Sequence, residues 1–193
     1  IQAYSKRALP VLVWINGLAK EHGDLIPLRL VKGAYWDSEI KEAQVEGYAD
    51  FPVFSRKPST DVSYQACAKK LLEYRDTIYP QFATHNAYTV ATILEMAQDS
   101  QGFQFQRLHG MGESLYDQVV NSKQVPCRVY APVGEHSVLR ANLVRRLLEN
   151  GANSSFVNNI VDENIPVESL LVDPVETVRG WSNKYNPQIP QSI

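Results

Sequence analysis

Features that would mark a specialised class of protein are scarce in this chain. Only two cysteines occur among 193 residues, at positions 67 and 127, so the chain has neither a disulfide framework nor zinc-ligand spacing. Lysine and arginine total 19 against 21 acidic residues, and without a long basic run there is no electrostatic footprint for nucleic acid. The longest apolar run, Ala8–Ile15, contains Pro10 and is shorter than the about 18 residues that a membrane-spanning helix needs.

What is present is the composition of an ordinary globular domain. Apolar residues make up 44% of the chain and charged residues 21%, and the length fits one domain with a sizeable core. Short segments rich in β-branched and aromatic residues predict strands over residues 28–35, 81–86, 103–109 and 127–132. Apolar residues at helical spacing predict helices over residues 3–20, 61–73, 89–98, 115–120 and 138–150.

Strands and helices alternate along the chain, and this order predicts a parallel sheet with helices packed outside it. Four strand–helix units are too few for a complete (βα)8 barrel, which takes about 250 residues, so half of a barrel and a small open sheet both fit. Residues 159–193 contain four prolines. Within this stretch we expect a short helix near residues 173–181, followed by a linker.

In βα folds the reactive groups gather where the strands end. Arg29 on an inner strand needs an anionic or hydrogen-bonding partner, and Gly33 in a strand marks the close approach of a ligand or another backbone. A snorkelling arginine and a packing glycine would give the same pattern. Thr84, His85 and Asn86 are three consecutive hydrogen-bonding side chains at the second strand end, where the alternative is a satisfied histidine beside a helix cap.

A polar face on the helix predicted over residues 138–150 carries the last candidates. Asn142, Arg145, Arg146 and Glu149 stand at i, i+3, i+4 and i+7, so they lie on one side of the helix. Paired arginines suit a carboxylate, because each guanidinium offers a planar fork of donors. A solvated outer face with ion pairs would show the same spacing. The histidines show no metal-ligand spacing.

Five motifs, in one order along the chain, carry more information than these patterns. They are RLVKGAYWD at 29–37, FATHNA at 82–87, FQRLHGMGE at 105–113, RVYAPVG at 128–134 and LVRRLLENGAN at 143–153. Together they resemble the flavin-dependent proline dehydrogenases, and most of all the proline dehydrogenase domain of the bifunctional proline utilisation A proteins.

The resemblance implies a fold and an activity. Residues 1–160 are expected to form about strands five to eight of an α/β (βα)8 TIM-type barrel, with residues 161–193 as a short helix and proline-containing linker. The implied reaction is the FAD-dependent oxidation of L-proline to Δ1-pyrroline-5-carboxylate, by hydride transfer to flavin and electron transfer to membrane quinone. The alternative is a catalytically incompetent half-barrel that serves as an assembly or interaction module.

The same resemblance implies partners and a place in the cell. An upstream half-barrel and a downstream aldehyde dehydrogenase domain are expected in a longer native chain, with no nucleic acid bound by this segment. The expected location is cytoplasmic, with the intact protein peripheral on the inner face of the cytoplasmic membrane, where it would meet quinone.

Residue by residue, the resemblance implies a site. Arg29 is expected beside flavin N5, and Arg145 and Arg146 are expected to grip the proline carboxylate, which makes these three the catalytic candidates. Leu108, Tyr130 and Asn142 are expected to complete the substrate pocket; close relatives usually have tyrosine at the position of Asn142. The expected FAD contacts are Arg29, Val31, Gly33, Ala34, Tyr35, Trp36, Ser55, Lys57, Thr84, His85, Asn86, Gln106, Arg146 and Glu149.

Overall fold

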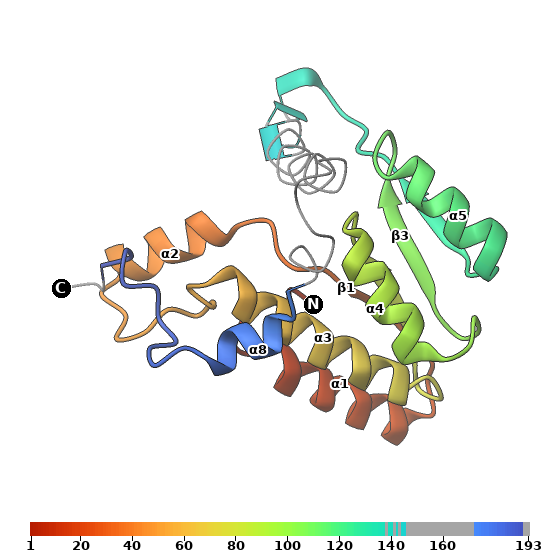
Figure 1. Ribbon diagram of the computed structural model, residues 1–193, viewed down its shortest axis with the longest axis horizontal. Coiled ribbons are helices and arrows are strands. Elements are labelled where there is room, and N and C mark those ends of the chain that lie inside the picture. Colours follow the sequence, from red (N-terminus) through yellow and green to blue (C-terminus); the bar gives the residue numbers. More distant parts are fainter. Residues whose placement is uncertain (138, 141, 143, 146–171, 191–193) are drawn as a thin grey trace.

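The computed structural model describes residues 1–137, 139, 140, 142, 144, 145 and 172–190, and its helices lie around one sheet (Figure 1). The elements in chain order are α1 (Ala8–His22), β1 (Ile26–Leu30), α2 (Trp36–Val45), α3 (Lys57–Glu73), β2 (Ile78–Ala83), α4 (Ala87–Ala97), β3 (Gln104–Leu108), α5 (Glu113–Lys123), β4 (Cys127–Tyr130) and α8 (Pro174–Arg179).

The four strands form a parallel sheet in the order β1-β2-β3-β4, which confirms the predicted arrangement. Leu30, Phe82, Phe105 and Cys127 are register partners across all four strands. Because neighbouring residues along a strand point to opposite faces, this apolar row defines one face of the sheet. Leu30, Phe82 and Phe105 are fully buried there.

The core lies between the apolar face and the helices. Leu12 of α1, Leu71 of α3, Ile93 of α4 and Tyr116 of α5 belong to the same buried cluster as Leu30 and the sheet phenylalanines. Cys67 is buried in this cluster and Cys127 is partly buried against it, both as free thiols, and burial raises the pKa of each.

The opposite face of the sheet is polar. Arg29 pairs in register with Gln81, and Gln106 pairs with Arg128. Arg29 and Arg128 are exposed although they lie within strands. Arg29, Gln106 and Arg128 therefore lie on the face opposite the buried apolar row.

The N-terminal helix is shorter than predicted. It begins at Ala8, not at residue 3, because residues 1–4 run alongside β1 in the parallel direction with a bridge between Gln2 and Val31. The amide of Ala3 donates to the carbonyl of Val31 at 2.8 Å, and the amide of Val31 donates to the carbonyl of Ile1 at 3.0 Å. Pro10 falls in the first turn of α1, where its missing N–H costs no helical bond.

The first predicted strand was too long and one helix was missed. β1 ends at Leu30, and the chain turns away at Gly33, whose φ is +134°. α2 follows at Trp36, with only Ile40 and Ala43 buried. So few buried residues leave a helical pattern too weak to find in the sequence. Of the helix predicted over 138–150, the described residues up to 145 are helical, and residues 146–150 lie outside the described part.

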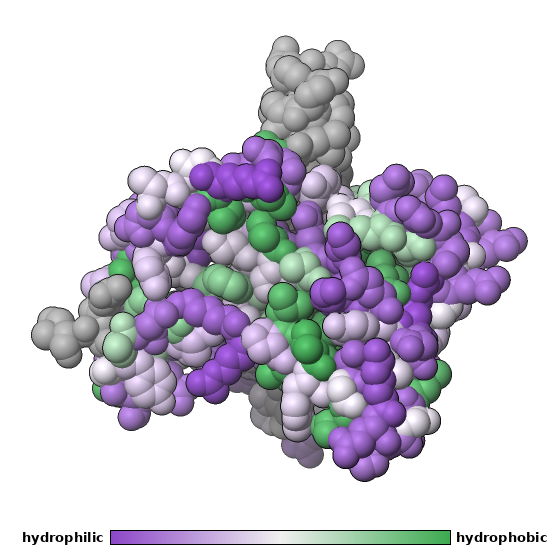
Figure 2. All heavy atoms as spheres, turned by 90° about the horizontal axis from the view of Figure 1, so that it is seen from below, coloured by the Kyte–Doolittle hydropathy of each residue, from purple (hydrophilic) through white to green (hydrophobic). Residues whose placement is uncertain are grey.

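Figure 2 views the molecule from the side of α1, where hydrophobic residues appear at the surface between hydrophilic ones. Val11, Val13 and Trp14 of α1 are exposed, Trp14 by 64%. None of the described helices is long and apolar enough to cross a bilayer.

Candidate functional site

A pocket of about 810 Å³ opens where the chain leaves β1. Its size falls within the about 300–1,000 Å³ typical of small-molecule and cofactor sites. The β1–α2 connection, the start of α3 and the segment after α8 supply its walls. Its lining includes Tyr4, Lys32, Gly33, Trp36, Ser55, Arg56, Lys57, Asp61, Trp181, Asn186, Pro187 and Gln188.

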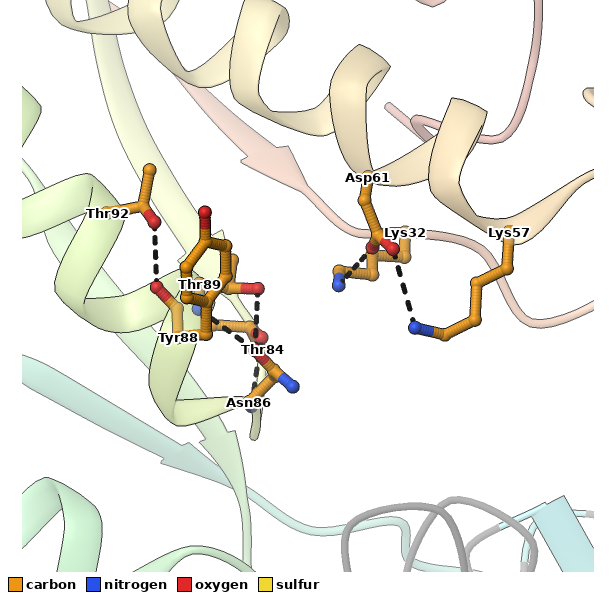
Figure 3. A network of polar contacts seen from close by, with 8 residues as sticks. All are labelled: Lys32, Lys57, Asp61, Thr84, Asn86, Tyr88, Thr89 and Thr92. Atoms are coloured by element: carbon orange, nitrogen blue, oxygen red, sulfur yellow. Dashed lines mark hydrogen bonds and ion pairs between the residues drawn. The ribbon is translucent and has the colours of Figure 1, made fainter. Parts of the chain in front are cut away.

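Two lysines share one carboxylate in this pocket (Figure 3). Lys32 Nζ lies 2.5 Å from Asp61 Oδ1, and Lys57 Nζ lies 3.4 Å from Asp61 Oδ2. Burial lowers the pKa of Lys32, and the neighbouring Asp61 partly opposes that shift. With Arg56, the lining contains three cationic side chains and one carboxylate. Such an excess of positive charge suits phosphate oxygens.

Gly33 and its neighbours shape the entrance to the pocket. A Cβ on Gly33 would lie 2.6 Å from Cδ1 of the Tyr4 ring, so the neighbour seen here is a side chain, as in the alternative of a packing glycine, and the approach of a ligand stays a prediction. Gly33 follows β1 and does not lie within a strand. Trp36 Nε1 donates to the carbonyl of Phe54 at 2.8 Å. Buried Ser55 accepts a hydrogen bond from the amide of Asn186 at 2.9 Å.

A second group of predicted site residues meets on the polar face of the sheet. Arg29 Nε donates to Gln106 Oε1 at 2.8 Å, and its guanidinium carbon lies 4.9 Å from the centre of the Tyr130 ring. β1, β3 and β4 each supply one of the three residues. The partner that Arg29 was expected to need is therefore an amide and an aromatic ring.

Thr84, His85 and Asn86 have structural roles at the ends of β2 and α4. Asn86 Oδ1 accepts from the amide of Thr89 at 2.9 Å and caps α4, and Thr84 Oγ1 accepts from the amide of Asn86 at 3.2 Å (Figure 3). His85 Nε2 accepts from the amide of Leu108 at 2.9 Å. These contacts match the alternative of a satisfied histidine beside a helix cap, with Asn86 forming the cap.

A smaller cavity, about 180 Å³, lies between α3 and α4. Lys32, Lys57 and Asp61 line one side of it, and Asn86 and Thr89 line the other. The two polar groups drawn in Figure 3 therefore border a common space.

The remaining candidates lie around these groups. Arg145 places its guanidinium carbon 4.6 Å from the centre of the Tyr35 ring. Asn142 is half-buried, Ala34 is exposed and Leu108 is buried. Arg146 and Glu149 lie outside the described residues. FAD and proline contacts at all of these positions stay predictions.

Sequence reasoning missed several residues of the pocket wall. Lys32 was given no role of its own, because the strand was predicted to run past it to residue 35. Asp61 stands four residues after Lys57, a spacing that signals an ion pair on a helix. No local signal pointed to Trp181 and Asn186, which were assigned to a helix end and a linker.

Comparisons with known proteins point to one family over most of the chain. The family model for proline dehydrogenase matches residues 1–159. The bifunctional protein PutA of Klebsiella aerogenes is 52% identical over 98% of this chain, and that of Rhizobium meliloti is 55% identical over 93%. The chain spans only 16% and 15% of the length of these relatives.

Solved structures give the same result. A crystal structure of a proline utilization A variant from Bradyrhizobium japonicum matches with a TM-score of 0.88 and 55% identity, over 99% of this chain and 20% of that one. The proline utilization A of Bdellovibrio bacteriovorus, inactivated by N-propargylglycine, matches with a TM-score of 0.84 and 36% identity, over 98% and 20%. The parallel sheet and its helices are thus those of an α/β barrel, and the chain belongs to the proline dehydrogenase family.

Proposed function

We propose that this chain supplies the flavin-binding side, and part of the substrate side, of an FAD-dependent proline dehydrogenase. The reaction is the oxidation of L-proline to Δ1-pyrroline-5-carboxylate, with electrons passed on to quinone. The observation that carries the proposal is the cationic pocket at the end of β1, in a chain of this family.

The residues of the pocket fit the parts of FAD. Lys32, Lys57 and Arg56 leave an excess of two positive charges over Asp61, which matches the two negative charges of a pyrophosphate. Trp36 adds an aromatic surface, and Gly33 lines the same pocket. When bound, FAD supplies the hydride acceptor.

The chain's own residues would bind, orient and hold charge. Arg29 is held by Gln106 and stacked on Tyr130, so the position of its charge is fixed by an amide and an aromatic ring. A fixed cation of this kind stabilises negative charge that develops during a reaction. Arg145, stacked on Tyr35, offers a guanidinium fork for the proline carboxylate, together with Arg146.

The wider context is proposed on the same basis. Residues 1–160 would contribute about strands five to eight of the barrel, and residues 161–193 would follow as helix and linker. An upstream half-barrel would face the polar side of the sheet. A downstream aldehyde dehydrogenase domain would take the product onward, and quinone would be met at the inner face of the membrane.

The test is a visible absorption spectrum of the full-length protein with FAD, before and after the proline analogue tetrahydrofuroic acid. The proposal predicts a structured flavin band that shifts with the analogue. The variant Arg145→Lys should keep the band and lose most of the shift, whereas Arg140→Lys, at an exposed position of the same helical stretch, should behave like the unaltered protein. A free-flavin spectrum would contradict the proposal, and a colourless oligomer unaffected by FAD would favour the assembly module.

A further inference from the structure

The segment after α8 is docked against the rest of the chain. We call residues 181–188 the tail segment. Arg56 holds it twice, because its Nε donates to the carbonyl of Tyr185 at 2.9 Å and its guanidinium carbon lies 4.3 Å from the centre of the Trp181 ring. Further along, the amide of Asn186 donates to Ser55 Oγ at 2.9 Å.

Contacts on either side keep the tail segment in place. α8 packs on α3, and Gln44 of α2 donates to the carbonyl of Pro190 at 2.7 Å. In Figure 1 the chain from α8 to residue 190 accordingly runs past α3 toward α2. A linker with no other role would not need a buried serine and an arginine to fix its path.

The tail segment forms one wall of the 810 Å³ pocket. Trp181, Asn186, Pro187 and Gln188 line the same cavity as Lys32 and the other residues near the end of β1. The pocket thus has two chemically different walls: one carries cations, and the other carries an indole ring and two side-chain amides.

The second wall suits a nucleobase. An indole ring offers a flat surface on which a heteroaromatic base stacks, and amide groups supply both donors and acceptors for the edge of a base. A ligand with a pyrophosphate at one end and a purine at the other would use both walls. FMN has one phosphate and no adenosine, so it would use only the first.

We propose that the tail segment is the adenosine-binding wall of the cofactor site and determines the preference for FAD over FMN. This inference rests on the proposed function, because it takes FAD as the cofactor. It adds Trp181, Asn186 and Gln188 to the binding residues, in a segment that otherwise reads as a linker.

Equilibrium titration of the full-length apoprotein with FAD and with FMN, followed by flavin fluorescence, tests the inference. Trp181→Ala should raise the Kd for FAD about tenfold, which corresponds to about 1.4 kcal/mol of lost stacking, and should change the Kd for FMN less than about twofold. Trp181→Phe should keep most of the FAD affinity. The matched control is Trp14→Ala, on the exposed surface of α1, which should change neither Kd.

Each result is decisive. If Trp181→Ala leaves the ratio of the two Kd values as it is in the unaltered protein, the tail segment does not bind adenosine. The inference is then wrong, while the proposed function stands. An equal weakening of both ligands also overturns it, since that marks general damage to the pocket. If the unaltered protein binds neither flavin, the proposed function fails, and this inference fails with it.

Discussion

Replacing Gly33 by alanine should damage the protein through two separate effects. The backbone at Gly33 has a φ of +134°, a region in which a side chain costs about 1–3 kcal/mol. The new Cβ would also lie 2.6–2.8 Å from three atoms of the Tyr4 ring. That ring is only 3% exposed, and its hydroxyl donates to Glu39 at 3.2 Å, so it has little room to move.

Overpacking of this kind costs about 1–3 kcal/mol more. We therefore expect Gly33→Ala to lower the free energy of unfolding by about 2–6 kcal/mol, a large share of the about 5–15 kcal/mol typical of a domain. Urea denaturation of the ligand-free protein, followed by circular dichroism, measures the change. Gly33 lines the pocket, so flavin affinity should fall in parallel.

A second glycine separates the two effects. Gly47 also has a positive φ, +66°, but a Cβ there would meet nothing within 4 Å, so Gly47→Ala should cost only the backbone strain of about 1–2 kcal/mol. Adding Tyr4→Ala to Gly33→Ala should recover about 1–3 kcal/mol relative to the sum of the single changes. Equal losses for the two glycine variants, with no coupling to Tyr4, would refute the reasoning.

Three further predictions concern the pocket and its supports. Lys32→Met should leave the ligand-free protein at least as stable at pH 7, because burial lowers the pKa of Lys32 and Asp61 keeps Lys57 as a partner. The same variant should weaken FAD binding about 10–100-fold, as measured by titration. Burial and then Glu39 raise the pKa of Tyr4 to about 12, so the contribution of this residue to stability is present below pH 10 and is lost as the pH rises toward 12. In urea denaturation, Tyr4→Phe should therefore make the midpoint fall less steeply with rising alkaline pH. An unchanged slope would count against this role of Tyr4. Asn86→Ala removes the cap of α4 and should cost about 0.5–2 kcal/mol in thermal unfolding, whereas a neutral result would mean that the cap bond is not needed.

The sheet was predictable because its strands and helices carry clear patterns. The runs around Phe82 and Phe105 are short and aromatic, and the stripes of α3 and α4 fill several turns, so the alternation of strands and helices and the parallel direction could be predicted. α2 was missed because it buries too few residues. The pairing of residues 1–4 with β1 depends on contacts nearly thirty residues apart, which no local pattern reports.

The site likewise contains residues that the sequence predicted and residues that it did not. Arg29, Gln106 and Tyr130 were named from motifs, and the register of the sheet brings them together. Lys32 was overlooked because the strand was predicted to continue past it, whereas β1 ends at Leu30 and Lys32 pairs with Asp61 of α3, 29 positions away. The wall around Trp181 forms through Arg56, far away in sequence, so only the folded chain reveals it.

The central claim is that this chain is part of an enzyme that oxidises L-proline with bound FAD. Anaerobic titration of the FAD-loaded full-length protein with L-proline, with the flavin absorbance recorded at each addition, tests it directly. The account predicts that the oxidised flavin band bleaches with L-proline and persists with D-proline, and that Arg145→Lys requires much more L-proline for the same bleaching. A protein that holds FAD tightly but keeps its flavin oxidised in saturating L-proline would contradict the account.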